Sequence, residues 1–364
     1  MASAAPLVLL AAGGTGGHLF PAEALAAVLA KRGVIVDLAT DTRAAHFKFP
    51  ARAVHVIPSA TLRGRDPISI LYTATMLAAG IGKAWLKLGE IRPSVVVGFG
   101  GYPTVPPLIA AWWRGTPTVL HEQNAVMGRA NRALASRVTS IATGFRALAN
   151  VNDKVRAKIT FTGNPVRPNV IEASRIPYGA VNIGGQLRLL VFGGSQGARV
   201  MSEIVPAAIE RLRPELRARL HVTQQARPED VDAVRLAYAR LGVQCECAPF
   251  FSDLPHRMAT VHLVISRSGA STVAELSAIG RPAILVPLPG ALDQDQFFNA
   301  GVLAGAGGAI RMVQTDFTPE RLAADIAALV ADPARLAGMA QASKAAGTLD
   351  AAERLADLVL ATAK

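Results

Sequence analysis

The chain has 364 residues, of which 51% are hydrophobic and only 5% aromatic, and its formal net charge is +12. This length favours two domains, and an aliphatic composition suits layered α/β folds better than β-sandwiches. The positive charge suits an anionic membrane surface or a polyanionic small substrate, whereas nucleic-acid binding is disfavoured because no stretch interleaves basic residues with stacking aromatics.

The first predicted elements are an apolar strand at 7–10, a glycine-rich loop and a helix at 21–32 that Pro21 opens. Glycines in the loop allow a sharp turn and the close approach of a ligand. The unpaired N–H groups and the dipole of the following helix favour an anion, most often phosphate. His18 stands at the rim of this loop and titrates near neutral pH. We therefore predict a phosphate-binding loop with an acid–base group beside it.

A long helix is predicted at 67–90. Its apolar positions and the cations in or beside it are Ile68, Leu71, Tyr72, Met76, Leu77, Ile81, Trp85 and Leu86, with Arg63, Arg65, Lys83, Lys87 and Arg92. One interpretation is a surface helix with a buried apolar stripe. The other is a membrane-facing patch, in which cations surround apolar residues and attract anionic head groups.

Two more strands lead directly into segments suited to ligand binding. Residues 94–107, SVVVGFGGYPTVPP, combine a strand, a glycine turn and the start of a helix. The strand at 116–124 ends in four consecutive polar residues, HEQN. Parallel α/β sheets bind ligands at the carboxyl ends of their strands. The sequence therefore predicts functional side chains among residues 121–124.

A domain boundary is predicted after residues 159–168, ITFTGNPVRP, because an irregular segment follows as far as Gly185. The second half begins again with LLVFGGSQG at 189–197, which repeats LLAAGGTGG at 9–17. Strands alternate with helices in both halves, so each half is expected to be a doubly wound parallel sheet. Three helices, at about 319–331, 333–345 and 350–363, close the chain.

The two cysteines and the N-terminus bear on the cellular compartment. Cys245 and Cys247 cannot complete a zinc site alone, and their spacing suits a disulfide poorly, so a reducing cytoplasm is favoured. Residues 1–14 lack the basic region of a signal peptide. No window approaches the roughly 20 uninterrupted apolar residues of a membrane-spanning helix. We expect a soluble or peripheral protein.

The second glycine loop also matches the G-x-S-x-G pattern of serine α/β-hydrolases. Ser195, Asp253 and His262 would supply the order of the catalytic triad. This alternative is disfavoured because Ser195 follows only the first strand of its half, and His262 begins a strand instead of lying in a late loop. A diphosphate held by the Ser195 hydroxyl and nearby N–H groups also explains the repeat of the first loop.

Two acidic motifs remain. Asp293 and Asp295 form a D-x-D pattern that could hold Mg²⁺, but we expect no metal, because Arg167 and Arg199 with the glycine loops already supply positive charge. Glu275 lies one turn into the helix that follows RSGAS. It could accept hydrogen bonds from a ribose, or it could be a first-turn glutamate stabilised by the helix dipole.

Taken together, several motifs resemble the MurG type of bacterial glycosyltransferase, which adds N-acetylglucosamine to the lipid-linked muramyl-pentapeptide precursor of peptidoglycan. They are GGTGGHLFPA (13–22), SATLRG (59–64), GFGGYPTVPP (98–107), HEQN (121–124), GNPVR (163–167), GGSQGAR (193–199), RSGASTVAE (267–275) and DQDQFFNA (293–300). The resemblance implies a GT-B architecture, with two Rossmann-like domains facing across a cleft. It implies an N-terminal acceptor and membrane-facing domain at 1–165, a C-terminal UDP-sugar domain at 166–344, and a last helix at 345–364 that returns to the first domain.

The resemblance also assigns roles by position. Ser195 and Arg167 would contact the diphosphate, the Phe251 backbone the uracil, Glu275 the ribose and Gln296 the sugar hydroxyls. Further donor contacts would come from Thr15, Gly16, Gly17, Asn124, Ala270, Ser271, Thr272, Val273 and Ala274. Gly100, Gly101 and Tyr102 would face the acceptor.

The implied reaction is an inverting transfer of N-acetylglucosamine from UDP-GlcNAc to the C4 hydroxyl of the muramyl sugar of lipid I, giving lipid II and UDP, with no cofactor. His18 is the first candidate for the general base and Glu122 the second, since Glu122 could instead orient His18. Region 62–92 would dock on anionic lipid at the cytoplasmic face of the inner membrane. A related GT-B enzyme with a glycolipid or natural-product acceptor is the alternative.

Overall fold

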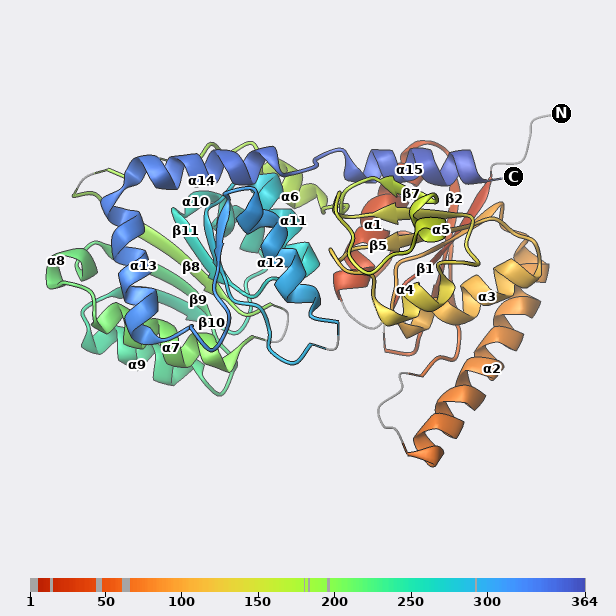
Figure 1. Cartoon of the computed structure of the whole chain (residues 1–364), viewed down its shortest axis with the longest axis horizontal. Coiled ribbons are helices and arrows are strands. Elements are labelled where there is room, and N and C mark those ends of the chain that lie inside the picture. Colours follow the sequence, from red (N-terminus) through yellow and green to blue (C-terminus); the bar gives the residue numbers. More distant parts are fainter. Residues whose placement is uncertain are drawn as a thin grey trace. The chain divides into compact units, whose positions relative to one another are not determined.

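The computed structural model describes residues 6–13, 16–43, 48–60, 66–179, 181–182, 184–194, 197–291 and 293–363. They form two compact units, one made of Met1–Arg167 with Thr348–Lys364 and the other of Pro168–Gly347. Each unit contains its own parallel sheet with helices on both faces (Figure 1). The expectation of two doubly wound α/β sheets is confirmed.

The N-terminal unit is built on a seven-stranded sheet of order β3-β2-β1-β4-β5-β6-β7. Its strands are β1 (Leu7–Ala11), β2 (Ile35–Thr40), β3 (Ala53–Val56), β4 (Val95–Gly98), β5 (Thr118–Glu122), β6 (Ser140–Thr143) and β7 (Ile159–Phe161). The direction of winding reverses between the neighbours β1 and β4. In such sheets the crevice beside the carboxyl ends of these two strands is the usual ligand site.

Both faces of β1 are buried, which explains its continuous apolar run. Val8 and Leu10 pack with one helix layer, and Leu9 and Ala11 with the other. The helices of this unit are α1 (Gly16–Lys31), α2 (Pro67–Ile91), η1 (Tyr102–Thr104), α3 (Val105–Trp113), α4 (Arg129–Leu134), α5 (Asp153–Arg156) and α15 (Ala351–Thr362).

Helix α1 begins at Gly16, five residues before the start that Pro21 suggested. The prediction was wrong because proline was taken as the first helical residue, its usual place. Here Pro21 lies inside the helix, where it leaves one intrahelical hydrogen bond unmade. His18 therefore stands in the first helical turn and not in the loop.

The last helix, α15, belongs to the N-terminal unit and packs beside α1 (Figure 1). Its buried residues Leu355, Ala356 and Val359 lie in the same apolar cluster as Leu25 of α1. The exposed residue Asp357 pairs with Arg32 at 2.6 Å, which adds little, because exposed ion pairs are weak. Apolar contact therefore holds the end of the chain in place.

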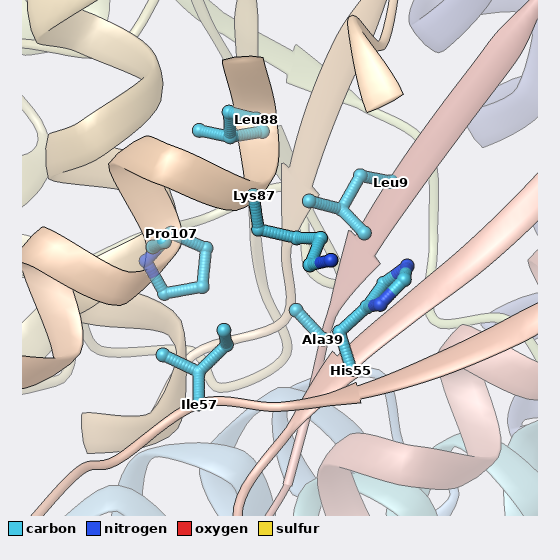
Figure 2. Close-up of a pocket in the computed structure, with 8 residues that line it drawn as sticks. Leu9, Ala39, His55, Ile57, Lys87, Leu88 and Pro107 are labelled. Atoms are coloured by element: carbon cyan, nitrogen blue, oxygen red, sulfur yellow. The ribbon is translucent and has the colours of Figure 1, made fainter. Parts of the chain in front are cut away.

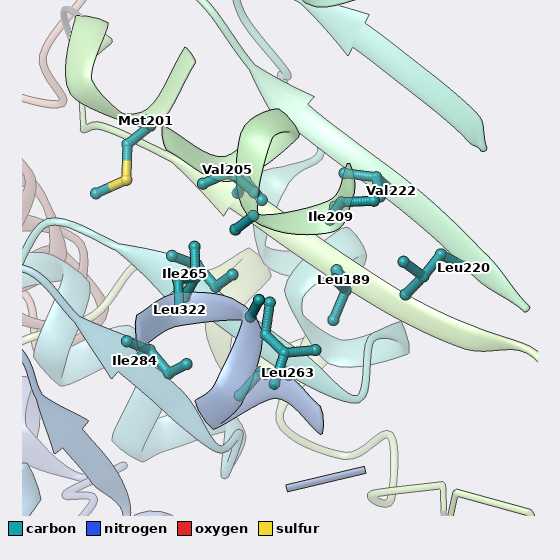
Figure 3. Packing of buried hydrophobic residues seen from close by; sticks show 14 of the residues in the cluster. Leu189, Met201, Val205, Ile209, Leu220, Val222, Leu263, Ile265, Ile284 and Leu322 are labelled. Carbon is teal, nitrogen blue, oxygen red and sulfur yellow. The ribbon is translucent and has the colours of Figure 1, made fainter. Parts of the chain in front are cut away.

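The C-terminal unit has a six-stranded sheet of order β10-β9-β8-β11-β12-β13, which reverses between β8 and β11. Its elements are α6 (Pro168–Ala173), β8 (Leu187–Phe192), α7 (Arg199–Glu210), α8 (Pro214–Arg217), β9 (Leu220–Gln225), α9 (Val231–Arg240), β10 (Gln244–Ala248), α10 (Leu254–Thr260), β11 (Leu263–Ser266), α11 (Ala270–Ile279), β12 (Ala283–Leu285), α12 (Asp295–Gly305), β13 (Ala309–Arg311), α13 (Pro319–Ala331) and α14 (Pro333–Ala345). Figure 3 shows strand residues such as Leu189 and Ile265 packing with Val205 of α7 and Leu322 of α13.

Helix α2 buries only a narrow stripe of mostly small residues, Thr73, Gly80, Ala84 and Leu88. A Cβ on Gly80 would lie 2.1 Å from the Pro58 carbonyl oxygen, so the helix packs too closely there for a larger residue. Most of its other large apolar residues point outward instead, and Ile68, Leu71 and Leu86 are 81%, 66% and 63% exposed, whereas Met76, Leu77 and Ile81 are half-buried. The interpretation of α2 as a helix that buries these residues in a stripe is therefore wrong.

Replacing Leu355 with alanine tests the docking of α15. We expect the N-terminal unit to lose about 2–5 kcal/mol of unfolding free energy, since a fully buried leucine would leave a cavity. Urea unfolding measures this loss of free energy, and hydrogen exchange of the α1 amides shows whether it falls on the N-terminal unit. The exposed neighbour Glu353, changed to alanine, is the matched control. Equal stability of the two variants would contradict the packing role.

Candidate functional site

The carboxyl ends of β1 and β4 bring His18 together with a glycine turn. Gly100 and Gly101 have φ angles of +84° and +73°, which glycine adopts without strain. A Cβ on Gly101 would lie 3.4 Å from His18 Nε2, so the bare backbone leaves room beside this nitrogen. The predicted acceptor-side segment, Gly100 to Tyr102, therefore borders the predicted base.

His18 itself is removed from solvent on its other side. Its Nδ1 atom is buried, and burial lowers the pKa of the imidazole below its usual value, because the charged form loses hydration. The nearby Gln123 side chain and Phe99 carbonyl oppose this shift, because acceptors close to the ring favour its charged form. His18 is consequently neutral at pH 7 and able to accept a proton.

His121 and Gln123 lie in the interior beneath this turn. His121 is fully buried, and desolvation lowers its pKa to about 4. Its Nε2 lies 3.2 Å from the Gly163 carbonyl oxygen and its Nδ1 lies 3.0 Å from Gln123 Nε2. The ring also packs on Phe99 with centroids 5.5 Å apart. A neutral imidazole is thus fixed within a hydrogen-bonded chain.

Glu122 is the one carboxylate of the HEQN segment, and it accepts four hydrogen bonds. One oxygen accepts from the Asn124 backbone N–H at 2.9 Å and from Asn124 Nδ2 at 3.3 Å. The other accepts from the Gly128 N–H at 3.0 Å and from Asn131 Nδ2 at 2.7 Å. Burial raises the pKa of this carboxyl, and these four donors counter the shift. Glu122 holds the loop 123–128 and presents Asn124, which is half-buried.

Arg167 lies with the N-terminal unit, its guanidinium 4.3 Å from the Phe20 ring centroid of α1. Gly16 and Gly17 open α1 at the same end. The predicted diphosphate contact Ser195 and the predicted donor contact Thr15 lie outside the described residues. Around Ser195, Gly194 and Gly197 have φ angles of +89° and +70°, as a tight glycine loop requires.

The start of α11 forms the corresponding edge of the C-terminal sheet. Ala270, Ser271, Thr272 and Ala274 are half-exposed there, whereas the Val273 and Glu275 side chains are buried. Glu275 is the sixth residue of the helix, so the alternative of a first-turn glutamate is wrong. Val273 can meet a ligand only through its backbone.

Gln296 joins two loops at this edge. Its Oε1 accepts from the backbone N–H groups of Ser268 at 3.3 Å and Leu288 at 3.0 Å, so its amide nitrogen is the group left for a sugar hydroxyl. Arg267 also stabilises the loop at this edge, although the sequence analysis gave it no role. Its guanidinium is buried and donates to the carbonyls of Val286 and Pro287. A charged side chain directly after an apolar strand is the signal that could have found it.

Phe251 is buried at the end of the loop after β10. The Arg257 guanidinium covers its ring at 4.4 Å and is itself bound by Asp253 at 2.7 Å. This stack fixes the backbone at Phe251, the part of the residue predicted to meet the uracil.

The serine-hydrolase alternative fails on sheet geometry. In the β8–β11 pair, Leu189 lies beside Leu263 and Phe192 beside Ser266, so His262 and the Gly193 loop emerge at opposite edges. Four residues of strand separate these edges by roughly 13 Å. His262 Nδ1 also accepts from the Arg188 N–H at 3.0 Å.

Asp295 is the first residue of α12, and its Oδ1 accepts from the Gln296 N–H at 2.9 Å. Within the described ranges, no three His, Cys, Asp or Glu side chains converge as metal ligands would.

Two hollows in the described structure do not suit the predicted substrates. One lies between α2, α3 and strands β1 to β3, with Leu9, His55 and Lys87 in its lining (Figure 2). Its volume of about 10 Å³ has room for one water at most. The other, of about 290 Å³, has Arg188 and His221 in its lining, at the amino ends of β8 and β9. Ligands of such sheets bind at the opposite edge.

The exposed apolar residues of α2 continue onto α3, where Trp112 and Trp113 are also exposed. Arg114 covers the Trp85 ring at 4.7 Å and Arg137 covers the Trp112 ring at 5.4 Å. We call the exposed residues Ile68, Ile70, Leu71, Tyr72, Trp85, Leu86, Trp112 and Trp113 the apolar patch. In the part of the chain that the structure describes, no helix has both the length and the apolar composition needed to cross a bilayer.

Comparison with known families identifies the family to which this chain belongs. Residues 8–143 match the glycosyltransferase family 28 N-terminal domain, and residues 188–355 match the family 28 C-terminal domain. The chain belongs to glycosyltransferase family 28. It is 61% identical over 362 residues to the UDP-N-acetylglucosamine--N-acetylmuramyl-(pentapeptide) pyrophosphoryl-undecaprenol N-acetylglucosamine transferase of Rhodopseudomonas palustris, with 99% of each chain covered. The enzyme of the same name from Nitrobacter winogradskyi is 59% identical, covering 99% of this chain and 98% of that one.

Solved structures agree with the family 28 assignment. The crystal structure of Acinetobacter baumannii MurG matches with a TM-score of 0.79 and 26% identity, covering 98% of this chain and 99% of that one. A UDP-GlcNAc 2-epimerase from Neisseria meningitidis also matches, with a TM-score of 0.66, 14% identity and coverage of 98% and 100%. At that identity the likeness shows the fold alone. The fold is GT-B, as expected, and the chain is a glycosyltransferase.

Changing Glu122 to glutamine tests its structural role. The amide keeps the size but turns a donor toward Asn131 or Gly128, so we expect a loss of about 2–4 kcal/mol of unfolding free energy. Hydrogen exchange at the Asn124 and Gly128 amides measures the loosening of the loop. The exposed residue Glu353, changed to glutamine, is the control. Unchanged protection in the Glu122 variant would contradict this role.

Proposed function

We propose that this protein transfers N-acetylglucosamine from UDP-GlcNAc to the C4 hydroxyl of the muramyl sugar of lipid I, giving lipid II and UDP for peptidoglycan synthesis. The observation that carries the proposal is 61% identity along essentially the whole chain to an enzyme named for that transfer. Acceptors of other GT-B enzymes, such as the one that makes kitacinnamycin, are disfavoured, because that match reaches only 20% identity.

The C-terminal unit is proposed to bind the donor. The half-exposed start of α11, with Ser271 and Thr272, and the Gln296 amide nitrogen lie at the ligand-binding edge of its sheet. The diphosphate is assigned to the glycine loop at 193–197 with Ser195, and to Arg167. N–H groups of a glycine loop and a guanidinium both stabilise the negative charge that develops on a departing diphosphate. Phe251 and Glu275 are assigned to the uracil and the ribose.

The N-terminal unit is proposed to hold the acceptor, with His18 as general base. Its Nε2 adjoins the bare Gly101 backbone, whereas both oxygens of Glu122 are occupied by four donors. The C4 oxygen attacks C1 of the donor sugar, its proton passes to His18 Nε2, and the bond from C1 to the diphosphate breaks. One such displacement inverts the α-linkage of the donor to a β-linkage.

The apolar patch is proposed to place the enzyme on the cytoplasmic face of the inner membrane as a peripheral protein. The eight exposed residues of the apolar patch would enter the head-group region. Arg114 and Arg137, which cover the Trp85 and Trp112 rings, would lie beside the anionic head groups. Tryptophan favours this interface, and each nearby cation adds about 1 kcal/mol on anionic lipid. Lipid I is anchored in the same membrane, so docking there raises the local concentration of the acceptor.

UDP release from UDP-GlcNAc, with and without a soluble lipid I analogue, tests the proposed function. We expect release that depends on the acceptor and persists in EDTA, because Arg167 and the glycine loop supply the required positive charge. Release without acceptor at the same rate would contradict a transferase, and no rise in melting temperature with UDP would contradict the donor site.

Changing His18 to asparagine tests the general base. We expect kcat to fall roughly 10²–10⁴-fold while the KM for UDP-GlcNAc stays within a few-fold. In the unchanged enzyme, the lowered pKa of His18 places the acidic limb of the kcat profile below pH 6.5, since activity needs the neutral imidazole. An asparagine variant with unchanged kcat would remove His18 from this role.

Changing both Leu71 and Leu86 to serine tests the apolar patch. We expect binding to vesicles that contain phosphatidylglycerol to weaken at least tenfold, because two exposed leucines lose their apolar contact with lipid. Vesicle flotation measures the binding. Leu236 of α9, which is 53% exposed in the other unit, is changed to serine as the control. Equal binding by both variants would contradict the docking role.

A further inference from the structure

Gln123 lies between the two histidines of the N-terminal site. Only 3% of the residue is exposed. Its Nε2 donates to the Phe99 carbonyl oxygen at 2.9 Å and to His121 Nδ1 at 3.0 Å. A buried amide that uses its nitrogen twice in this way has a fixed orientation, provided that both partners can only accept.

Both partners can indeed only accept. A carbonyl oxygen such as that of Phe99 has no proton to give. His121 Nε2 faces the Gly163 carbonyl oxygen at 3.2 Å, so the single proton of the neutral ring resides on Nε2, and Nδ1 carries the lone pair. Turning the Gln123 amide over would place its oxygen against that lone pair and against the Phe99 oxygen. The Gln123 nitrogen therefore points toward His121, and its oxygen points away.

The oxygen of this amide is available to His18. A Cβ on Gly100 would lie 3.5 Å from Gln123 Oε1 and one on the adjacent Gly101 would lie 3.4 Å from His18 Nε2, so the two side chains meet at the same glycine turn. The Gln123 side chain and the Phe99 carbonyl also oppose the lowering of the His18 pKa, as acceptors near the imidazole do. Among the described residues, His18 Nδ1 and Gln123 Oε1 are both buried and neither makes a hydrogen bond at standard geometry, so each is a complementary partner for the other. Nε2 of His18 is the nitrogen beside Gly101. Gln123 Oε1 can only accept a hydrogen bond, so the His18 nitrogen that faces it, Nδ1, must carry the proton.

We propose that Gln123, held in place by His121, is a positioning residue that keeps the proton of His18 on Nδ1 and leaves Nε2 free to take the proton of the attacking hydroxyl. This inference rests on the proposed role of His18 as general base. When Nε2 accepts the proton, the Gln123 and Phe99 oxygens face the resulting imidazolium, and His121 stays neutral because its pKa is about 4. The chain from Gly163 through His121 and Gln123 thus selects which nitrogen of His18 reacts.

Nuclear magnetic resonance of ¹⁵N-histidine-labelled protein tests the tautomer directly. Comparison with the His18→Asn variant assigns the His18 signals, and long-range proton–nitrogen correlations identify the protonated nitrogen. We expect the Nδ1–H form for His18 and the Nε2–H form for His121 at pH 7.5. A His18 ring protonated at Nε2 in the neutral state would overturn the proposal.

Kinetics of the Gln123→Met variant tests the consequence for catalysis. Methionine fills a similar volume without an acceptor, so we expect kcat to fall about 10- to 100-fold, with the KM for UDP-GlcNAc within twofold, because a hydrogen bond to a charged imidazolium is lost. The matched control is Gln224→Met, another buried glutamine, whose amide bonds Met201 and Tyr238 in the other unit. It loses stability but keeps its kcat. Unchanged kcat in the Gln123→Met variant would overturn the proposal.

The Gln123→Glu variant keeps the proposal testable if methionine prevents folding. A carboxylate facing His18 Nδ1 raises the pKa of the imidazole, so the acidic limb of kcat moves to higher pH than in the unchanged enzyme. An unmoved limb in a folded variant would overturn the proposal. If His18 is protonated on Nδ1 but His18→Asn retains full kcat, the proposed base fails and the catalytic role of Gln123 fails with it. If only Gln123→Met retains kcat, the base stands and Gln123 alone is excluded.

Discussion

The N-terminal half of the site depends on a buried carboxylate. Glu122 accepts three hydrogen bonds from the loop that follows β5 and one from Asn131 of α4, so it ties the loop to the helix. A buried charge is tolerated only when its hydrogen bonds are satisfied. The four hydrogen bonds offset the cost of burying Glu122, and the loop that they hold carries Asn124. The carboxylate organises this part of the structure, and the His18 imidazole is the group proposed to take the proton.

The two units share one arrangement of sheet, glycine loop and helix. In each sheet the winding reverses between two neighbouring strands, and a glycine loop leaves one of them for the start of a helix. The N-terminal reversal carries His18 and the Gly100–Gly101 turn. The C-terminal reversal carries the loop at 193–197 and the start of α11. This repetition makes one unit suited to the nucleotide and leaves the other to specialise for the acceptor and the membrane, as proposed above.

Much of this organisation could be predicted from sequence because it depends on local patterns. Apolar strands followed by glycine loops gave the two parallel sheets and placed HEQN at a strand end. One error had a physical cause, because Pro21 was taken as the start of α1. Of the two interpretations of α2, the buried stripe of large apolar residues failed because the small residues Gly80 and Ala84 make the buried contact. Pairings such as Glu122 with Asn131, or Gln123 with His121, are tertiary contacts that no periodicity in the sequence reports.

The central claim is that one direct displacement, assisted by His18, joins the two sugars. The most direct test is the anomeric configuration of the disaccharide made from UDP-GlcNAc and a lipid I analogue, read from the proton coupling constant at C1 of the transferred sugar. A single displacement predicts a β-linkage in all of the product. An α-linked product would contradict the account, because it would require either two successive displacements or attack on the face that the diphosphate leaves.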